Sequence, residues 1–187
     1  LGDVYKRQML EAAIQAAGKG VQVMIGVAES HGREDTMRLI GRLPRLPMKK
    51  MAYRGVQMEE FDLEEALRVK PQLILVDELA HTNVPGMRHR KRYQDVEDLL
   101  AAGIDVYTTL NVQHLESRSD TVHDITAAPV QETVPDSVLA EADCIQLVDI
   151  TPEQLRTRLQ EGKVYSAPQA SAALNHFFKE SNLTALR

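Results

Sequence analysis

The sequence predicts an α/β fold in which helices cover both faces of a mainly parallel β-sheet. Helical segments and short apolar segments alternate along the 187 residues, which is the order that βαβ units produce. Residues 73–76 form an uninterrupted apolar run, as expected of a strand buried on both faces. The sequence contains no internal repeat, low-complexity tract or flexible linker of note, and its length suits one domain.

The predicted helices carry apolar residues at helical spacing, and glycine or proline marks where most of them end. In chain order they cover residues 9–17, 34–41, 61–69 and 92–102. Residues 137–142 favour a turn or a further helix. Thr151 followed by Pro152 then predicts a helix start, because threonine caps a helix and proline suits its first position. From Gly162 onward the sequence is again helical in character.

The predicted strands are short, apolar and bounded by glycine or polar residues. In chain order they cover residues 21–28, 49–53, 73–76, 104–111 and 144–150. The second of them is the least regular, and the turn Arg54-Gly55 ends it. Each of the others follows a helical segment, so helix and strand alternate as far as residue 150.

Composition and charge disfavour several function classes. The net charge is −5, from 22 basic and 27 acidic residues, which gives no basic field for nucleic acid. The longest strongly apolar stretch, residues 21–28, is far shorter than the roughly 20 residues that cross a bilayer, and the chain begins with no apolar signal-peptide core. The one cysteine, Cys144, lies in an apolar run and is predicted to be a small core residue, which fits a reducing, cytoplasmic setting.

Two carboxylates follow the most apolar predicted strand. Asp77 and Glu78 come directly after residues 73–76 in the pattern of a Walker B strand, and ligands of open α/β sheets bind where such strands end. Asp77 is the candidate to hold Mg²⁺ through water, and Glu78 is the candidate catalytic base that orients an attacking water. The alternative is an ordinary strand end with solvated acids. Thr82, in the polar loop that follows, is a candidate nucleotide-binding residue.

Polar clusters also follow two other predicted strands. Residues 29–33 (ESHGR) follow the first strand, and residues 108–114 (TTLNVQH) leave the fourth. In the second cluster the amides of Asn111 and Gln113 are candidates to sense a terminal phosphate or to orient water. Three such clusters at one sheet edge would outline a cleft. Each is also what a simple strand-to-loop cap would contain, and the six histidines form no recognisable zinc motif.

The densest basic run is residues 87–92 (MRHRKR). Its usual explanation is a solvated helix start. The alternative is contact with phosphate or with an acidic partner, because guanidinium groups bind phosphate oxygens in pairs. No aromatic residue interleaves with the basic ones, so the run makes a poor nucleic-acid surface.

Taken in order, these motifs resemble a known family. The matching segments are residues 27–33 (VAESHGR), 75–83 (LVDELAHTN), 92–96 (RYQDV), 103–116 (GIDVYTTLNVQHLE), 132–137 (ETVPDS) and 162–165 (GKVY). They are similar to the N-terminal cytoplasmic domain of KdpD, the osmosensitive potassium-channel sensor histidine kinase, from residue 9 to the end of the chain. The resemblance implies a P-loop-NTPase-like regulatory domain with ATP and Mg²⁺ as cofactors.

The family implies a membrane two-component kinase that controls a high-affinity potassium uptake system by phosphorelay signalling. The implied partners are the remaining domains of the sensor and, through them, a response regulator. Nucleic acid and membrane contact are not expected of this segment, and a homodimer stays open. The parent would be a histidine protein kinase, a transferase, and this segment a cytoplasmic domain of an inner (plasma) membrane protein. Because the kinase core is absent, we expect no catalytic activity from this chain alone.

One departure from the family pattern concerns the phosphate loop. The family has a Gly-rich Walker A loop ending in Gly-Lys-Thr directly before the segment seen here as residues 9–13 (MLEAA), whereas this chain has LGDVYKRQ at residues 1–8. Lys6 is out of register with the family lysine, so the resemblance gives it no phosphate role. We interpret residues 1–8 as foreign or misassembled sequence and residues 9–187 as the family domain, truncated at both ends. ATP and Mg²⁺ binding is then expected to be weak or lost, and the sheet to have an empty position and an exposed edge.

Two further function classes compete with nucleotide sensing. The first is a non-catalytic protein-interaction module of the same sensor, which would use residues 88–92 and the strand-end clusters. The second, an independent P-loop phosphotransferase, is disfavoured because the chain has no phosphate loop and no evident substrate-binding insert.

Overall fold

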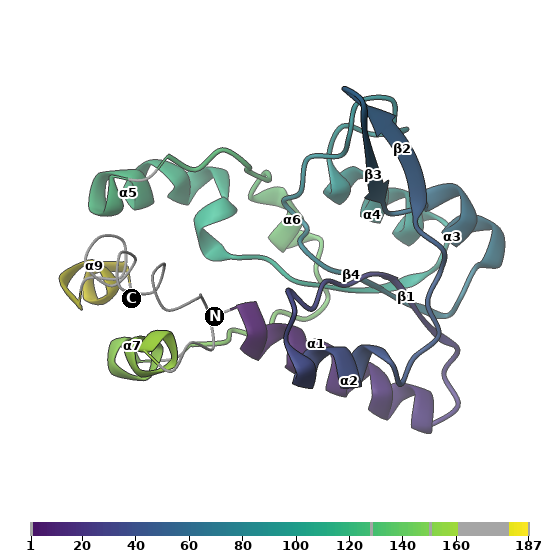
Figure 1. The fold of residues 1–187 in the computed structure, drawn as a ribbon, viewed down its shortest axis with the longest axis horizontal. Helices are drawn as coiled ribbons and strands as arrows, with labels where there is room; N and C mark the ends of the chain where they lie inside the picture. Colours follow the sequence, from purple (N-terminus) through teal and green to yellow (C-terminus); the bar gives the residue numbers. More distant parts are fainter. Residues whose placement is uncertain (1, 128, 150, 161–179, 187) are drawn as a thin grey trace. The chain divides into compact units, whose positions relative to one another are not determined.

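The computed structural model describes residues 2–127, 129–149, 151–160 and 180–186 (Figure 1). Two compact units make up the chain. One consists of residues 4–110, and the other consists mainly of residues 111–187. The single domain that the sequence predicts over residues 9–187 stays a prediction, as does the foreign origin of residues 1–8.

The first unit contains a parallel sheet of three strands in the order β1-β4-β5. The strands are β1 (Val23–Val27), β4 (Leu73–Val76) and β5 (Asp105–Thr108), and β4 pairs in parallel with both neighbours. All four residues of β4 are buried, because strands cover both of its edges and helices cover both of its faces. The predicted parallel arrangement around residues 73–76 is confirmed.

Helices lie on both faces of this sheet (Figure 1). On one face are α1 (Gly2–Gly18) and α2 (Glu34–Ile40), and on the other are α3 (Leu63–Val69) and α4 (Arg92–Ala101). Leu10 and Ala13 of α1 have no exposed surface and belong to the same core as Ile25 of β1. The predicted α/β class is therefore confirmed. The helix predicted to start at residue 9 extends further toward the N-terminus, where residues 2–8 form its first turns.

A two-stranded hairpin extends the first unit. Its strands are β2 (Lys49–Tyr53) and β3 (Val56–Glu60), joined by the two-residue turn Arg54-Gly55. Both turn residues have positive φ, 50° and 80°, the geometry that suits the twist of a tight hairpin. The sequence predicts β2 and the turn but not β3, because four of its five residues are exposed and only Glu60 is buried. Such a strand carries no apolar alternation to detect.

The two outer strands of the sheet have different surroundings. Residues 44–46 run beside β1, where Ile25 donates its N–H to the carbonyl of Pro44 and accepts from the N–H of Leu46. Among the residues that the structure describes, β5 pairs with β4 alone. Most of β5 is exposed, including Tyr107 at 39%. The empty sheet position expected from the sequence stays a prediction.

The second unit is helical in its described parts. It contains the 3-10 helix η1 (Val112–His114) and the α-helices α5 (Glu116–Thr126), α6 (Ser137–Ala140), α7 (Pro152–Gln160) and α9 (Glu180–Leu186). The predicted cap at the start of α7 is confirmed, since Gln154 donates its N–H to the Thr151 hydroxyl at 3.2 Å. The sequence does not predict α5, a largely polar helix. Its second residue, Ser117, donates its N–H and its hydroxyl to the Asp136 carboxylate.

The strand predicted over residues 144–150 is wrong within the described part of the chain. Residues 144–149 form no strand, and Cys144 is exposed and not a core residue. Leu147 is 85% exposed and Ile145 60%. An apolar run becomes a strand only where a neighbouring strand takes its backbone hydrogen bonds, and no described residue does so here. Ile150 and most of the helical region predicted from Gly162 lie outside the described residues.

No helix in the described ranges combines the length and the apolar character required to span a membrane.

The close packing of β1 against the helical face leads to a first prediction. A Cβ at Gly26 would lie 2.6 Å from a ring carbon of Phe61 and 3.0 Å from Ile74 Cδ1, and Phe61 is buried. We expect Gly26→Ala to lower the free energy of unfolding by about 1 to 3 kcal/mol through overpacking, as measured by urea denaturation. The control is Gly18→Ala, because a Cβ there meets nothing within 4 Å. An equal loss in both variants would contradict this explanation.

Candidate functional site

Residues that follow the three parallel strands meet at the carboxyl edge of the sheet. Glu29 follows β1, Asp77 follows β4 and Thr109 follows β5. The backbone N–H of Glu29 donates to Asp77 Oδ2 at 3.4 Å, and the Thr109 hydroxyl donates to Asp77 Oδ1. Parallel strands all end at one edge, which is where α/β proteins bind ligands. The structure thus brings members of all three predicted clusters together.

The Asp77 carboxylate is 1% exposed and is satisfied by donors on several sides. Besides Glu29 and Thr109, the N–H of Glu78 donates to Oδ1 at 3.1 Å. The ammonium of Lys6 lies 2.8 Å from Oδ2. A buried carboxylate requires such partners, because an unpaired charge in the interior costs several kcal/mol. Asp77 is therefore a buried, charge-compensated carboxylate, not a solvated acid at a strand end.

Lys6 is the residue at this site that the sequence does not predict. Its side chain is 3% exposed, and its ammonium contacts Asp77 at 2.8 Å and Glu78 Oε1 at 3.0 Å. Burial disfavours the charged form, but the two carboxylates outweigh burial and raise the pKa of Lys6 above its usual value. No local sequence signal marks this role, since it depends on α1 bringing Lys6 to Glu78, which lies 72 residues further along the chain.

Glu78 has an unusual backbone and a partly open side chain. Its φ is 58°, a left-handed conformation that is costly for any residue other than glycine. Its Oε1 lies 3.0 Å from Lys6 Nζ and 3.3 Å from His31 Nε2, and the side chain is 40% exposed. Burial raises the pKa of Glu78, but the hydrogen bond and charge of Lys6 and the contact with His31 give a net lowering. The candidate base is therefore kept ionised next to Asp77.

The other predicted site residues are found in the loop between β4 and α4 and around η1. The hydroxyl of Thr82 accepts a hydrogen bond from Lys91 Nζ at 2.9 Å, within the loop between β4 and α4. Asn111 and Gln113 belong to the second unit, where Asn111 precedes η1 and Gln113 lies within it. A nucleotide-binding role for these three residues stays a prediction.

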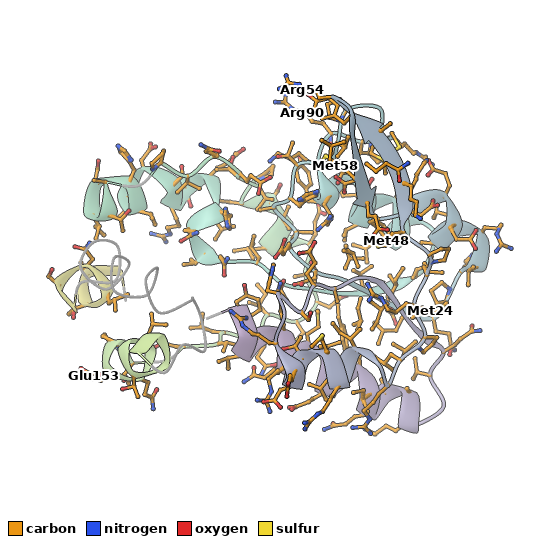
Figure 2. The ribbon with its side chains drawn as sticks, in the orientation of Figure 1. Met24, Met48, Arg54, Met58, Arg90 and Glu153 are labelled. Carbon is orange, nitrogen blue, oxygen red and sulfur yellow. The ribbon has the colours of Figure 1, made fainter. Side chains whose placement is uncertain are left out.

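Several residues of the basic run form ion pairs or hydrogen bonds within the chain. Arg88 and His89 both contact Asp98, at 3.0 and 2.9 Å. Arg92 is 4% exposed, so a solvated helix start is the wrong explanation for this residue. Arg90 is exposed and lies towards the outer end of the hairpin in Figure 2.

Asp77 supplies one carboxylate, the type of ligand that a cation with water in its shell uses. Mg²⁺ is usually held by one or two carboxylates and several waters, and no group of three or more His, Cys, Asp or Glu residues in the described ranges could hold a metal directly. In this structure Lys6 and the Glu29 N–H contact one Asp77 oxygen, while Thr109 and the Glu78 N–H contact the other. Binding of Mg²⁺ through water therefore stays a prediction. A triphosphate is not fitted in the same way, because residues 2–8 form turns of α1 and provide no Gly-rich loop of N–H donors.

The fold and the site define a class: an α/β domain with a buried, charge-compensated carboxylate at the end of its central parallel strand. Within that class, a family model described as "KdpD: Osmosensitive K+ channel His kinase sensor domain" matches residues 2–187. The chain belongs to this family. The resemblance stated from the sequence motifs is confirmed.

Full-length relatives agree with this assignment. The chain is 54% identical over 179 residues to the Sensor protein KdpD of Escherichia coli (strain K12) and 51% identical over 179 residues to that of Clostridium acetobutylicum. It is 47% identical over 179 residues to the Sensor protein KdpD of Mycobacterium tuberculosis. Each match covers 96% of this chain but only 20% or 21% of the relative, so the chain spans about a fifth of the length of these proteins.

The buried ion pair leads to a prediction about stability and metal. We expect Lys6→Met to lose about 3 to 5 kcal/mol of unfolding free energy, because it leaves the Asp77 carboxylate buried without its cation. We expect excess MgCl₂ to restore part of this loss in the Lys6→Met variant and to stabilise the unsubstituted chain less. The measurement is urea unfolding with and without the salt.

The matched control for this measurement is Arg7→Met, which removes the neighbouring basic side chain. Arg7 is 40% exposed and reaches Glu11 and Asp35 only at 3.7 Å, so its loss should cost little. If Mg²⁺ raises the free energy of unfolding equally in the unsubstituted chain and in Lys6→Met, Asp77 is not the metal partner.

The lowered pKa of Glu78 leads to a prediction about acid stability. A carboxyl whose pKa is lower in the folded state than its usual 4.5 stabilises the fold above that pH, and this contribution is lost as the pH falls through the folded-state pKa. We therefore expect the free energy of unfolding to fall less steeply with decreasing pH below 4.5 in Glu78→Gln than in the unsubstituted chain. Some acid sensitivity should remain, because the pKa of the Glu60 carboxyl is also lowered. The control for net charge is Glu59→Gln on the exposed part of β3; an unchanged slope in Glu78→Gln would refute the assignment.

Proposed function

We propose that this chain is the regulatory nucleotide-binding domain of a sensor histidine kinase that controls a high-affinity potassium uptake system. The observation that carries the proposal is the buried Asp77 at the end of β4, with Glu78 beside it and donors from Glu29 and Thr109 around it. This is where an open α/β sheet binds its ligand. The description of the family supplies the kinase and the link to potassium, and the relatives are named as sensor proteins.

In this proposal the chain supplies the metal half of a nucleotide site. Asp77 would hold the hydration shell of Mg²⁺, and the metal would neutralise phosphate charge when bound. Glu78 would orient water from its position beside Asp77. The phosphate-binding half has no counterpart in residues 2–8, so this chain is expected to bind ATP weakly or not at all.

The proposed setting follows from the relatives, which are sensor proteins about five times longer than this chain. The domain would act on the remaining kinase domains and, through them, on a response regulator by phosphorelay. It would lie on the cytoplasmic side of an inner (plasma) membrane protein, and it could pair with a second copy of itself.

The second candidate is a protein-interaction module of the same sensor that does not turn over nucleotide. One observation favours it: the β2–β3 hairpin exposes two large apolar side chains, Val56 at 62% and Met58 at 40%, and Met58 can be seen on the hairpin in Figure 2. The basic run contributes less to this alternative than the sequence suggests, since Arg88 and Arg92 have acidic partners within the chain.

The test is a titration of a fluorescent ATP analogue, with Mg²⁺, into two proteins. One is the chain itself, and the other has residues 1–8 replaced by a strand and a Gly-rich loop ending in Gly-Lys-Thr. We expect only the second to bind. In that background Asp77→Asn should weaken Mg²⁺-dependent binding by roughly 10- to 100-fold, the usual cost of losing a group that orients a metal's ligands.

Glu59→Gln in the same background is the control, because it removes one exposed carboxylate from the hairpin. If binding survives Asp77→Asn unchanged, the assigned role of Asp77 is wrong. If neither protein binds, the nucleotide proposal fails and the interaction module becomes the better description.

A further inference from the structure

We propose that Arg92, anchored by Glu60, is a positioning residue that fixes the peptide between Asp77 and Glu78 and thereby the direction of the Glu78 carboxylate. Its importance for a nucleotide site rests on the function proposed above. The positioning itself concerns the folded chain alone and can be tested without any ligand.

The peptide that joins Asp77 to Glu78 is held at both of its polar ends. Arg92 donates from one terminal nitrogen to the Asp77 carbonyl at 2.9 Å. The N–H of the same peptide, which belongs to Glu78, donates to the Thr109 hydroxyl at 3.0 Å. A peptide plane with a fixed carbonyl and a fixed N–H cannot rotate without breaking one of the two hydrogen bonds.

The two hydrogen bonds restrain a residue, Glu78, whose backbone conformation is unfavourable. Glu78 has φ 58°, and such a conformation persists in a non-glycine residue only when its surroundings impose it. With this φ, the Glu78 side chain lies on the same side as Lys6 and His31. A rotated peptide would remove the carbonyl from Arg92 and release the Glu78 carboxylate from that place.

Arg92 is itself held by a second buried carboxylate. Its other terminal nitrogen donates to Glu60 Oε2 at 3.4 Å, and the side chains of Arg92 and Glu60 are 5% and 2% exposed. Glu60 also accepts hydrogen bonds from the Val84 N–H at 2.9 Å and from His81 Nε2 at 3.0 Å. The pair therefore joins the last residue of the hairpin to the first residue of α4 and, through Arg92, to the Asp77 carbonyl directly after β4.

The chemistry of arginine suits this role. A guanidinium presents several donors in one rigid plane, so it can serve a carbonyl and a carboxylate at the same time, whereas an ammonium acts as a flexible point charge. Arg92 Nε has no partner among the described residues. A cation buried with one unsatisfied donor is a costly choice for stability alone, which favours a positioning role over simple packing.

The test uses the chain as it is, labelled with ¹⁵N, and measures amide hydrogen exchange by NMR for Glu78 and for Ile25. The variants are Arg92→Lys, which keeps the positive charge but loses the planar set of N–H donors, and Glu60→Gln, which keeps the shape of the side chain but loses its charge. Arg90→Lys on the exposed side of the same run is the matched control (Figure 2). Ile25 reports general destabilisation, because its N–H bonds to the Pro44 carbonyl at the other edge of the sheet.

We expect exchange at Glu78 to become faster by at least about tenfold relative to Ile25 in both variants, since a hydrogen bond to a charged group is worth about that factor or more. Arg90→Lys should leave the ratio unchanged. Equal acceleration at Glu78 and Ile25 would make Arg92 an ordinary stabilising residue, and no acceleration at Glu78 would mean that Arg92 does not hold the peptide; either result overturns the proposal. Since no nucleotide or metal is added, failure of the nucleotide proposal leaves this result intact.

Discussion

The burial of the Asp77 carboxylate is the constraint on which the rest of the first unit depends. Strand β4 is enclosed by neighbours on both edges and helices on both faces, so the charge that follows it enters an environment of low polarity. Such a charge must be compensated from within the protein. Lys6 supplies the opposite charge, while Thr109 and the backbone N–H groups of Glu29 and Glu78 supply hydrogen bonds. The same demand explains why four separate segments of the chain converge on one sheet edge.

A second buried charge pair lies on the other side of the same peptide. Glu60 and Arg92 connect the hairpin to the carbonyl of Asp77, so the two networks share one backbone unit. One network compensates the Asp77 side chain, and the other restrains its backbone. This arrangement explains how a residue with a left-handed backbone, Glu78, can be retained immediately after the central strand. The hairpin buries little apolar surface of its own. The hydrogen bonds of Glu60 and Arg92 connect it to the candidate site.

Local signals in the sequence predict those parts of the fold that depend on neighbouring residues. The positions of β2 and β4 and the cap at Thr151 are recovered because apolar runs, the two-residue turn and capping chemistry are all local. Strand β3 is missed because its exposed residues carry no pattern, and the strand at residues 144–150 is predicted wrongly because strand formation requires a partner that a single segment cannot reveal. At the site, Asp77 and Glu78 are predicted from their position after a buried run. Lys6 and Arg92 are not, because their roles depend on contacts with residues far away in the sequence.

The unpaired side of β5 has a consequence for handling the protein. Among the residues that the structure describes, its second edge pairs with no strand, and Tyr107 is partly exposed. An edge of this kind is a template for strands of other molecules. Strand β1 has no such open edge, because residues 44–46 run along its outer side. Association between copies of the chain should therefore begin at β5, grow with concentration and resist salt, since backbone hydrogen bonds and not surface charges would hold the copies together. A single proline in β5 would remove one of the backbone donors on which such pairing depends.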